Sequence, residues 1–266
     1  MKKPAERAPA QDGSAVKTVA KVLDLLEHVA AAGRPISVSE LAVSTGFNVS
    51  TAHRLMQTLA RRKYVEQDPS TRTYALGSRL LELGSAYTGS LDLVGAARPR
   101  MEALRDLAGE TVHLAILSER DVVEICTAGG RQAVTVSRGA GRRDPAHCTA
   151  TGKVLLAELA PNELDRFFAM GPLSPLTPQS ITDRDEFLAE LQRARKVGYA
   201  IDDEELCEDV CCVGVPVRNR SGRTTAALSL AMPKARFRSR NVAGWAKMLT
   251  EHAAQISNAL PLSGDA

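Results

Sequence analysis

Features that place a chain in a membrane or outside the cell are missing from this sequence. Its 266 residues contain no uninterrupted run of about 18 apolar residues, so we expect no membrane-spanning helix. Residues 1–13 include two lysines but no apolar run behind them, which predicts a disordered tail rather than a secretory signal. The five cysteines are odd in number and include no Cys-x-x-Cys pair, so the expected compartment is a reducing cytoplasm.

Motifs for cofactors and catalysis are also scarce. A Gly152-Lys153 pair invites comparison with a phosphate-binding loop, but His147 replaces the first glycine and Val154 replaces the final Ser or Thr. His147 and Cys148 are neighbours on the chain and so are poorly placed to act as a nucleophile and its base. We therefore expect no catalytic residues, no cofactor and no enzyme activity.

The cysteines leave one alternative open. Three of them lie close together in the sequence, at Cys207, Cys211 and Cys212, and a histidine such as His113 could join them at a zinc ion. No closed four-ligand spacing is present, so buried apolar roles are the simpler interpretation and no metal is expected. A cysteine-based redox or metal sensor stays as the alternative hypothesis for this chain.

Net charge is small, and its distribution is more informative than its size. Residues 1–90 carry 12 Lys and Arg against 8 Asp and Glu, a balance of +4, while the remainder has a balance of −1. The positive excess gathers in the N-terminal third, as a nucleic-acid-binding end requires.

The organising segment of that third is 48–63, whose positions sort by helical geometry. Apolar residues share one stripe, and a row of donors and guanidinium groups lies opposite them. That polar row consists of Ser50, Arg54, Gln57 and Arg61, with Thr51 and His53 at its flanks. Such side chains suit phosphate oxygens and base edges in a major groove of DNA, although any amphipathic helix also has a polar outer face.

The surroundings of this helix favour DNA binding over a plain surface helix. Ser37 and Glu40 form a predicted capping box before a short helix, Gly46 predicts a tight turn, and Asn48 is positioned to cap the next helix. Two short strands, 64–67 and 72–76, predict a hairpin directly afterwards. We interpret this hairpin as a wing with Arg72 near a phosphate; the alternative is a surface hairpin with a solvated arginine.

The rest of the chain predicts a mixed α+β domain. Helical periods over 78–83 and 91–108 are interrupted by glycines and by Pro99, so we expect a linker helix over 78–95 before a domain spanning 96–262. Adjacent hairpins favour an α+β sheet over a doubly wound one. The expected strands are 111–117, 121–127, 134–137, 199–202, 210–217 and 224–232, with a solvated Arg/Gly loop at 138–143. The expected helices are 150–159, 161–168, 182–196 and 242–260.

Over residues 14–260 the sequence resembles the IclR family of bacterial transcriptional regulators. The resemblance lies in the segment 37–84 and in the stretches HCTATGKVLLAEL, GYAIDDEE and VCCVGVPVRNRSGRTTAALSLAMP. It implies a winged helix-turn-helix over 14–77, a C-terminal GAF-like effector-binding domain, and homodimers or homotetramers on double-stranded operator DNA. It also implies a small-molecule acid effector, which fits the unpaired N–H donors that a helix N-terminus offers to an anion.

Individual effector-binding residues follow from the resemblance alone. It implies that the backbone N–H groups of Ala150 and Thr151 hold the negative end of the effector. Asp202, Cys212 and Ser229 match polar positions that line the pocket. The sequence departs from some family members at Ala231, where a second serine can stand, and this favours a larger or less polar acid. We therefore expect a ligand-responsive regulator, by default a repressor that its effector releases.

Overall fold

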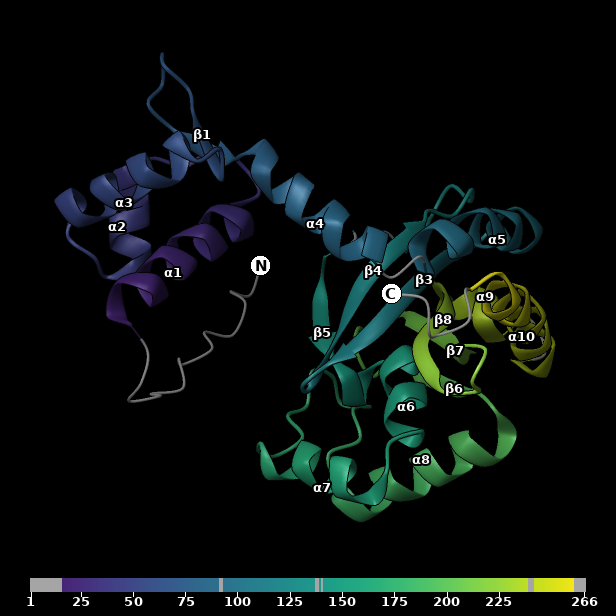
Figure 1. The fold of residues 1–266 in the computed structure, drawn as a ribbon. Coiled ribbons are helices and arrows are strands. Elements are labelled where there is room, and N and C mark those ends of the chain that lie inside the picture. Colours follow the sequence, from purple (N-terminus) through teal and green to yellow (C-terminus); the bar gives the residue numbers. More distant parts are fainter. Residues whose placement is uncertain (1–15, 91–92, 137–138, 140, 239–241, 261–266) are drawn as a thin grey trace. The chain divides into compact units, whose positions relative to one another are not determined.

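The computed structural model describes residues 16–90, 93–136, 139, 141–238 and 242–260. Its contacts divide the chain between Tyr87 and Thr88 into two units, which are described separately (Figure 1). Within the described ranges, no helix is long and apolar enough to span a bilayer.

The first unit is a helix-turn-helix followed by a hairpin. Ser37 and Glu40 form the capping box that starts the second helix, and Gly46 ends that helix at a φ of 72°. The third helix starts at Asn48, whose side chain accepts a hydrogen bond from the Thr51 N–H. These local signals confirm the predicted element order. The elements are α1 (Lys17–Ala32), α2 (Val38–Thr45), α3 (Val49–Arg61), β1 (Val65–Gln67), β2 (Tyr74–Leu76) and the start of α4 (Ser78–Ser90).

The core of the first unit explains why α3 has one apolar stripe. Its buried residues pack with those of α1, α2 and the hairpin in one cluster. Tyr74, fully buried in β2, also bridges to Ile36 in the loop before α2, which ties the hairpin to the helices. The buried face of α3 consists of Ala52, Leu55, Met56 and Leu59.

The hairpin differs from the prediction at Arg72. The second strand begins at Tyr74 because Arg72 adopts a left-handed φ of 59° and lies in the turn. Asp68 organises this turn by accepting hydrogen bonds from the backbone N–H groups of Ser70 and Thr71. The hydrogen bond from the Ser70 hydroxyl, together with these two bonds, lowers the pKa of the Asp68 carboxyl to about 2.

The second unit contains a six-stranded antiparallel sheet in the order β5-β4-β3-β8-β7-β6. Two hairpins, β3–β4 and β7–β8, form its centre, and β3 pairs with β8 to join them. Its strands are β3 (Thr111–Ser118), β4 (Asp121–Ala128), β5 (Arg143–Pro145), β6 (Ala200–Asp203), β7 (Val210–Arg218) and β8 (Thr224–Pro233). Its helices are α5 (Leu93–Ala108), the 3-10 turn η1 (Ala146–Cys148), α6 (Ala150–Ala157), α7 (Pro161–Ala169), α8 (Arg184–Val197), α9 (Lys234–Arg238) and α10 (Val242–Ala259).

Helices cover both faces of this sheet and create two cores. One core lies between the sheet and helices α5 and α10, and it includes the buried Trp245. The second core lies between the opposite face and helices α6, α7 and α8. The predicted α+β class is therefore confirmed, and the site described below lies on the α6 face.

One strand of the second unit differs from the sequence-based expectation. Val134, Thr135 and Val136 form no strand, and Ser137 lies outside the described residues; the edge strand is β5 instead. Arg142 and Arg143 are exposed, as expected, and they also pair with Asp144 and Asp121.

Helical interruptions were also over-predicted. Helix α4 continues through Gly84 and Gly89, and α5 continues through Gly95 and Pro99. A proline in a helix interior removes one hydrogen bond, and here the tertiary packing of α5 outweighs that cost.

Candidate functional site

The structure places the predicted DNA-binding residues on the outer side of the first unit. Six of the seven side chains are exposed, and Thr51 is half-buried at the start of α3. The exposed side chains on α3 and in the hairpin turn carry hydroxyl, imidazole, amide or guanidinium groups. The exposed set is Ser50, His53, Arg54, Gln57, Arg61 and Arg72.

Two of these side chains already take part in local hydrogen bonding. The Ser50 hydroxyl donates to the Asn48 side chain at 3.0 Å, so Ser50 supports the cap of α3. The His53 and Gln57 side chains approach each other at 3.5 Å, one helical turn apart. The guanidinium groups of Arg54 and Arg61 project from the same helix into solvent, where phosphate or base contacts are available to them.

The predicted effector-binding residues gather around one cavity in the second unit. All six of them line it, although they come from helix α6 and from three different strands. The cavity volume is about 30 Å³, which is room for one or two water molecules. Its lining residues are His113, Val122, Glu124, Val136, Asp144, Thr149, Ala150, Thr151, Asp202, Leu206, Val210, Cys212, Ser229 and Ala231.

Strand register explains why these distant residues meet. Asp202 pairs with Cys212, and Cys212 pairs with Ala231, which gives one row across β6, β7 and β8. A second row, two residues further along each strand, joins Gly214 to Ser229. Residues two apart on a strand face the same side, so both rows lie under α6. Cys211, one residue from Cys212, lies in the core on the opposite face.

Helix α6 brings a buried N-terminus onto this face. Thr149 caps the helix by accepting a hydrogen bond from the Gly152 N–H at 2.9 Å. Ala150 and Thr151 are 1% and 6% exposed, and within the described ranges no acceptor pairs with their backbone N–H groups. Unpaired N–H groups together with the helix dipole favour an anion at this point.

Two glycines make the close approach of α6 possible. A Cβ at Gly214 would stand 2.9 Å from the backbone of Ala150, so only glycine lets the helix start rest on β7. A Cβ at Gly152 would stand 2.1 Å from the Ala146 carbonyl oxygen. The sequence did contain a signal, because a glycine inside an apolar strand is typical of a close backbone approach.

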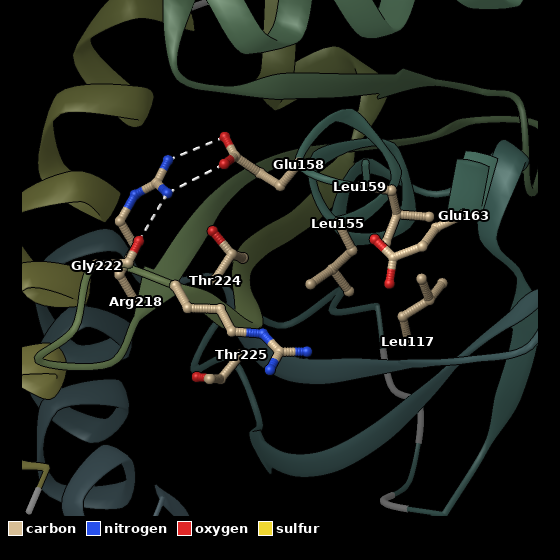
Figure 2. A pocket seen from close by; sticks show the side chains of 10 residues that line it. Leu117, Leu155, Glu158, Leu159, Glu163, Arg218, Gly222, Thr224 and Thr225 are labelled. Carbon is tan, nitrogen blue, oxygen red and sulfur yellow. Dashed lines mark hydrogen bonds and ion pairs between the residues drawn. The ribbon is translucent and has the colours of Figure 1, made fainter. Parts of the chain in front are cut away.

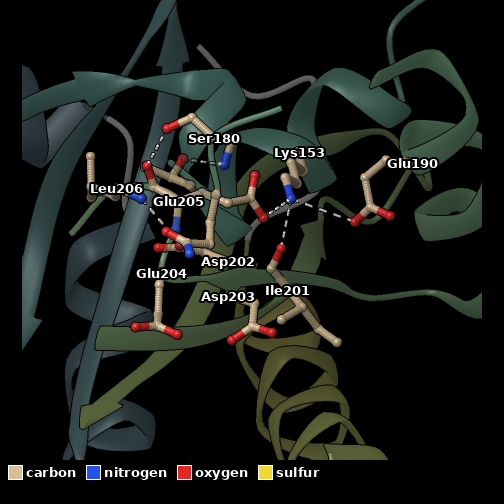
Figure 3. Close-up of polar contacts among 12 residues, drawn as sticks. Lys153, Ser180, Glu190, Ile201, Asp202, Asp203, Glu204, Glu205 and Leu206 are labelled. Atoms are coloured by element: carbon tan, nitrogen blue, oxygen red, sulfur yellow. Dashed lines mark hydrogen bonds and ion pairs between the residues drawn. The ribbon is translucent and has the colours of Figure 1, made fainter. Parts of the chain in front are cut away.

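A buried ion-pair network supports the acidic wall of the cavity (Figure 3). The Lys153 ammonium group pairs with Glu205, donates to the Ile201 carbonyl at 2.9 Å and lies 3.6 Å from Glu190. Asp202 Oδ1 accepts hydrogen bonds from the N–H groups of Glu205 and Leu206, at 2.8 and 3.3 Å. The Lys153 network therefore holds the segment that follows β6 in place beside Asp202.

Burial shifts the ionisation of Asp202 in the cavity wall. It raises the pKa of Asp202 to about 7, and the negative charge of Glu205 adds to the effect.

Two cysteines outside the cavity wall are affected in the same way. Burial raises the pKa of Cys148 to about 11 and that of Cys211 to about 12. These two thiols are therefore kept protonated and unreactive.

The sequence did not assign His113 and Glu124, among other lining residues, to this cavity. His113 lies directly across the β3–β8 ladder from Ser229, and its Nδ1 is 3.2 Å from Glu124 Oε2. A β-bulge at Ile125 shifts the register between β3 and β4, so Glu124 faces the α6 side while Cys126 faces the opposite core. Alternation alone would have put both residues on one face, and the sequence gives no sign of the bulge.

A larger hollow of about 450 Å³ lies where α6 ends against the β7–β8 hairpin (Figure 2). Arg218 donates from two nitrogens to Glu158 on one side of it, at 2.9 and 3.1 Å. Two of its charged groups, Arg218 and Glu158, thus already pair with each other, and none of the predicted effector-binding residues lines it. The smaller cavity is therefore the better candidate for an anion.

Comparison with known proteins assigns the chain to a family. A family model described as "IclR helix-turn-helix domain" matches residues 18–69, and one described as "Bacterial transcriptional regulator IclR C-terminal" matches residues 85–258. The chain belongs to the IclR family of bacterial transcriptional regulators. The predicted winged helix-turn-helix and GAF-like domain are thereby confirmed, as is the expectation of a regulator rather than an enzyme.

Individual IclR-family proteins match almost the whole chain. The HTH-type transcriptional regulator XynR of Escherichia coli K12 is 33% identical over 245 residues, which are 92% of this chain and 97% of that protein. The HTH-type transcriptional repressor AllR of Escherichia coli K12 is 29% identical and covers 98% of this chain and 96% of its own.

A solved structure matches at the level of the fold as well. An IclR homolog from Microbacterium hydrocarbonoxydans, complexed with 4-hydroxybenzoate, aligns with a TM-score of 0.82 and 26% identity. The alignment covers 91% of this chain and 98% of that one.

Proposed function

We propose that this IclR-family regulator is a repressor that a small organic acid releases from its operator. The observation that supports an acidic effector is the start of α6, where two buried backbone N–H groups have no acceptor among the described residues. A carboxylate beside Ala150 and Thr151 satisfies these donors and the helix dipole together. Asp202, Cys212, Ser229 and Ala231 then surround the remainder of the molecule.

Two of the similar proteins support this proposal. AllR is named a transcriptional repressor, and the Microbacterium homolog is complexed with an aromatic acid. The absence of a hydroxyl at Ala231 agrees with an acid of that size better than with a very small oxoacid.

On the DNA side, we propose that α3 enters a major groove and that the hairpin acts as a wing. Ser50, Arg54, Gln57 and Arg61 then face the bases or phosphates, with Thr51, His53 and Arg72 beside the backbone. A homodimer or homotetramer presents two such helices to symmetric half-sites in the cytoplasm. The proposed division is a DNA-binding domain over 14–77, a linker helix over 78–95 and an effector domain over 96–262.

Release requires that the effector distinguish two conformations of the protein. A cavity of about 30 Å³ is too small for a benzoate ring, so an aromatic acid must displace part of the lining. Leu206, on the segment that the Lys153–Glu205 pair anchors, and Val210, at the start of β7 directly after it, are half-buried lining residues. Their displacement links acid binding to movement of that segment.

The cysteine-sensor alternative is less well supported. Of the three cysteines named for it, Cys211 has a high pKa, which makes its thiol a poor nucleophile. In the part of the chain that the structure describes, no cluster of three or more His, Cys, Asp or Glu could hold a metal ion.

The proposal is tested with the purified full chain and the DNA upstream of its own gene. We expect preferential binding to that DNA over random duplex of equal length at a fixed salt concentration. One or more members of a panel of organic acids should weaken this binding. Ser229→Ala should lower the sensitivity to the acid several-fold without changing DNA affinity. Equal affinity for both duplexes, with and without acids, would refute the proposal.

A further inference from the structure

The cavity contains a polar group that nothing in the proposed carboxylate site uses. His113 is 4% exposed and lines the cavity, yet its Nε2 has no hydrogen-bond partner among the described residues. Leaving a buried polar atom unpaired costs free energy that a suitable ligand atom would recover. Such an atom in a ligand cavity therefore indicates a missing ligand contact.

We propose that His113, positioned by Glu124, forms a hydrogen bond with a hydroxyl group of the effector. This hydroxyl lies at the end of the effector opposite its carboxylate. The inference rests on the proposed acid-binding function and adds a chemical class to it, namely hydroxylated acids. His113 would be a specificity-determining residue because it pairs with one group of the ligand that related acids lack.

The position of His113 on the sheet supports a contact at the far end. The start of α6 rests on Gly214 in β7, whereas His113 lies on β3, two strands further across the sheet. Two strand spacings amount to about 10 Å. A ligand whose carboxylate meets the α6 amides and crosses Ser229 therefore reaches His113 only with its opposite end.

The geometry of the imidazole explains why a hydroxyl fits best. Nδ1 faces the Glu124 carboxylate at 3.2 Å and the Thr127 hydroxyl at 3.4 Å, so the ring is fixed and Nε2 is left for the cavity. Nε2 accepts a hydrogen bond in one protonation state and donates in another, and a hydroxyl is able to do either. An ammonium group, which can only donate, could not match both states.

Charge in the cavity disfavours a second carboxylate at this end. Glu124 and Asp144 line the same small space, and they would repel a second anionic group on the ligand. Arg142 pairs with Asp144 and offsets part of that charge. A neutral hydroxyl group is not repelled by these carboxylates.

The test compares matched acids that differ by one hydroxyl on the full-length protein. The pairs are 4-hydroxybenzoate with benzoate, 4-hydroxyphenylacetate with phenylacetate, and 6-hydroxyhexanoate with hexanoate, measured by calorimetry. In at least one pair the hydroxylated member should bind about tenfold more tightly. His113→Phe should abolish that preference while the affinity for the unhydroxylated acid stays within about threefold.

Two further variants separate recognition from folding. His113→Gln keeps a hydrogen-bonding group near the Nε2 position and should retain part of the preference, so it decides the case if His113→Phe fails to fold. His252→Phe is the matched control, because His252 is also buried but lies on α10, against the opposite face of the sheet. It should keep the full preference.

The outcomes distinguish this inference from the function on which it rests. Acids that bind without any preference for the hydroxyl, or a preference that survives in both His113 variants, would overturn the inference alone. If no acid of the panel binds the wild-type protein, the proposed acid-binding function fails and this inference fails with it. An equal loss of affinity for both members of a pair in the His113 variants would assign His113 a purely structural role.

Discussion

Helices α3 and α6 start in the same way but in opposite surroundings. In each, the cap side chain accepts a hydrogen bond from the backbone N–H three residues later, Asn48 from Thr51 and Thr149 from Gly152. The start of α3 is exposed to solvent, whereas the first turn of α6 is buried between the sheet and its neighbours. The remaining N–H donors are solvated in α3 and desolvated in α6.

This difference suits the two helices to different partners. An exposed helix start with arginines nearby suits a large polyanion such as DNA, whose affinity then depends on salt. A buried helix start suits one small anion, because hydrogen bonds are stronger away from water. The buried site also has space for only a small group. The predictions below test how far each helix depends on its surroundings.

The largest effect is expected at the buried support of α6. Lys153→Met should lower the free energy of unfolding of the second unit by about 3–5 kcal/mol, because Glu205 and Glu190 lose a buried cation. Trp245 is the one tryptophan of the chain and lies in this unit, so its fluorescence during guanidinium unfolding provides the measurement. Lys196→Met, at an exposed position on α8, is the control and should change little. A loss below about 1 kcal/mol for Lys153→Met would contradict this account.

The exposed helix should respond in binding rather than in stability. Arg54→Ala should weaken operator binding by about 1–3 kcal/mol if the guanidinium contacts a base, and leave the thermal midpoint unchanged. Fluorescence anisotropy at constant salt measures the first quantity, and scanning calorimetry the second. Lys196→Ala, in the other unit, should leave DNA affinity unaltered. Wild-type affinity in Arg54→Ala would remove this residue from the interface.

A pH dependence should belong to the α6 cavity. The pKa of Asp202 is raised to about 7, so its neutral form is favoured in the folded state. This contribution to stability is complete below about pH 4, the pKa of an unfolded Asp, and is lost as the pH rises through 7. An anionic effector also prefers the neutral form, so its affinity should fall about tenfold between pH 6 and pH 8.

The corresponding variant is Asp202→Asn, which stays neutral over that range. Calorimetric titration with the tightest-binding acid should then give nearly the same affinity at pH 6 and pH 8. A pH dependence as steep as that of the wild type would assign the proton to another group of the cavity.

The same contrast between α3 and α6 explains how much the sequence reveals. Helix α3, its cap at Asn48 and its polar row follow from local periodicity, because each feature depends on residues within one or two turns. The α+β class and most element positions likewise follow from local patterns. The position of Arg72 was predicted only in part, because strand propensity does not indicate that an arginine adopts a left-handed conformation in the turn.

Predicting the cavity requires information about strand register that local sequence patterns do not contain. The resemblance to a known family proposed six of its lining residues, but their meeting point depends on strand register across β6, β7 and β8. The contact of His113 with Glu124 depends on one bulge at Ile125, because a single-residue shift reverses the face that Glu124 occupies. Gly214 was the one local signal that could have located the α6 contact.

The smallest effect is expected from a matched pair of cap variants. Asn48→Ala should lower stability by about 1 kcal/mol, because water replaces the lost cap at an exposed helix start. Thr149→Ala should cost about 1 kcal/mol more, since the Gly152 N–H is buried and water cannot reach it. Hydrogen exchange at the amides of Thr51 and Gly152 reports each cap separately, and DNA and acid titrations report the linked function. Equal losses at the two caps would mean that burial does not distinguish these helix starts, and the contrast between α3 and α6 would then lie in their side chains alone.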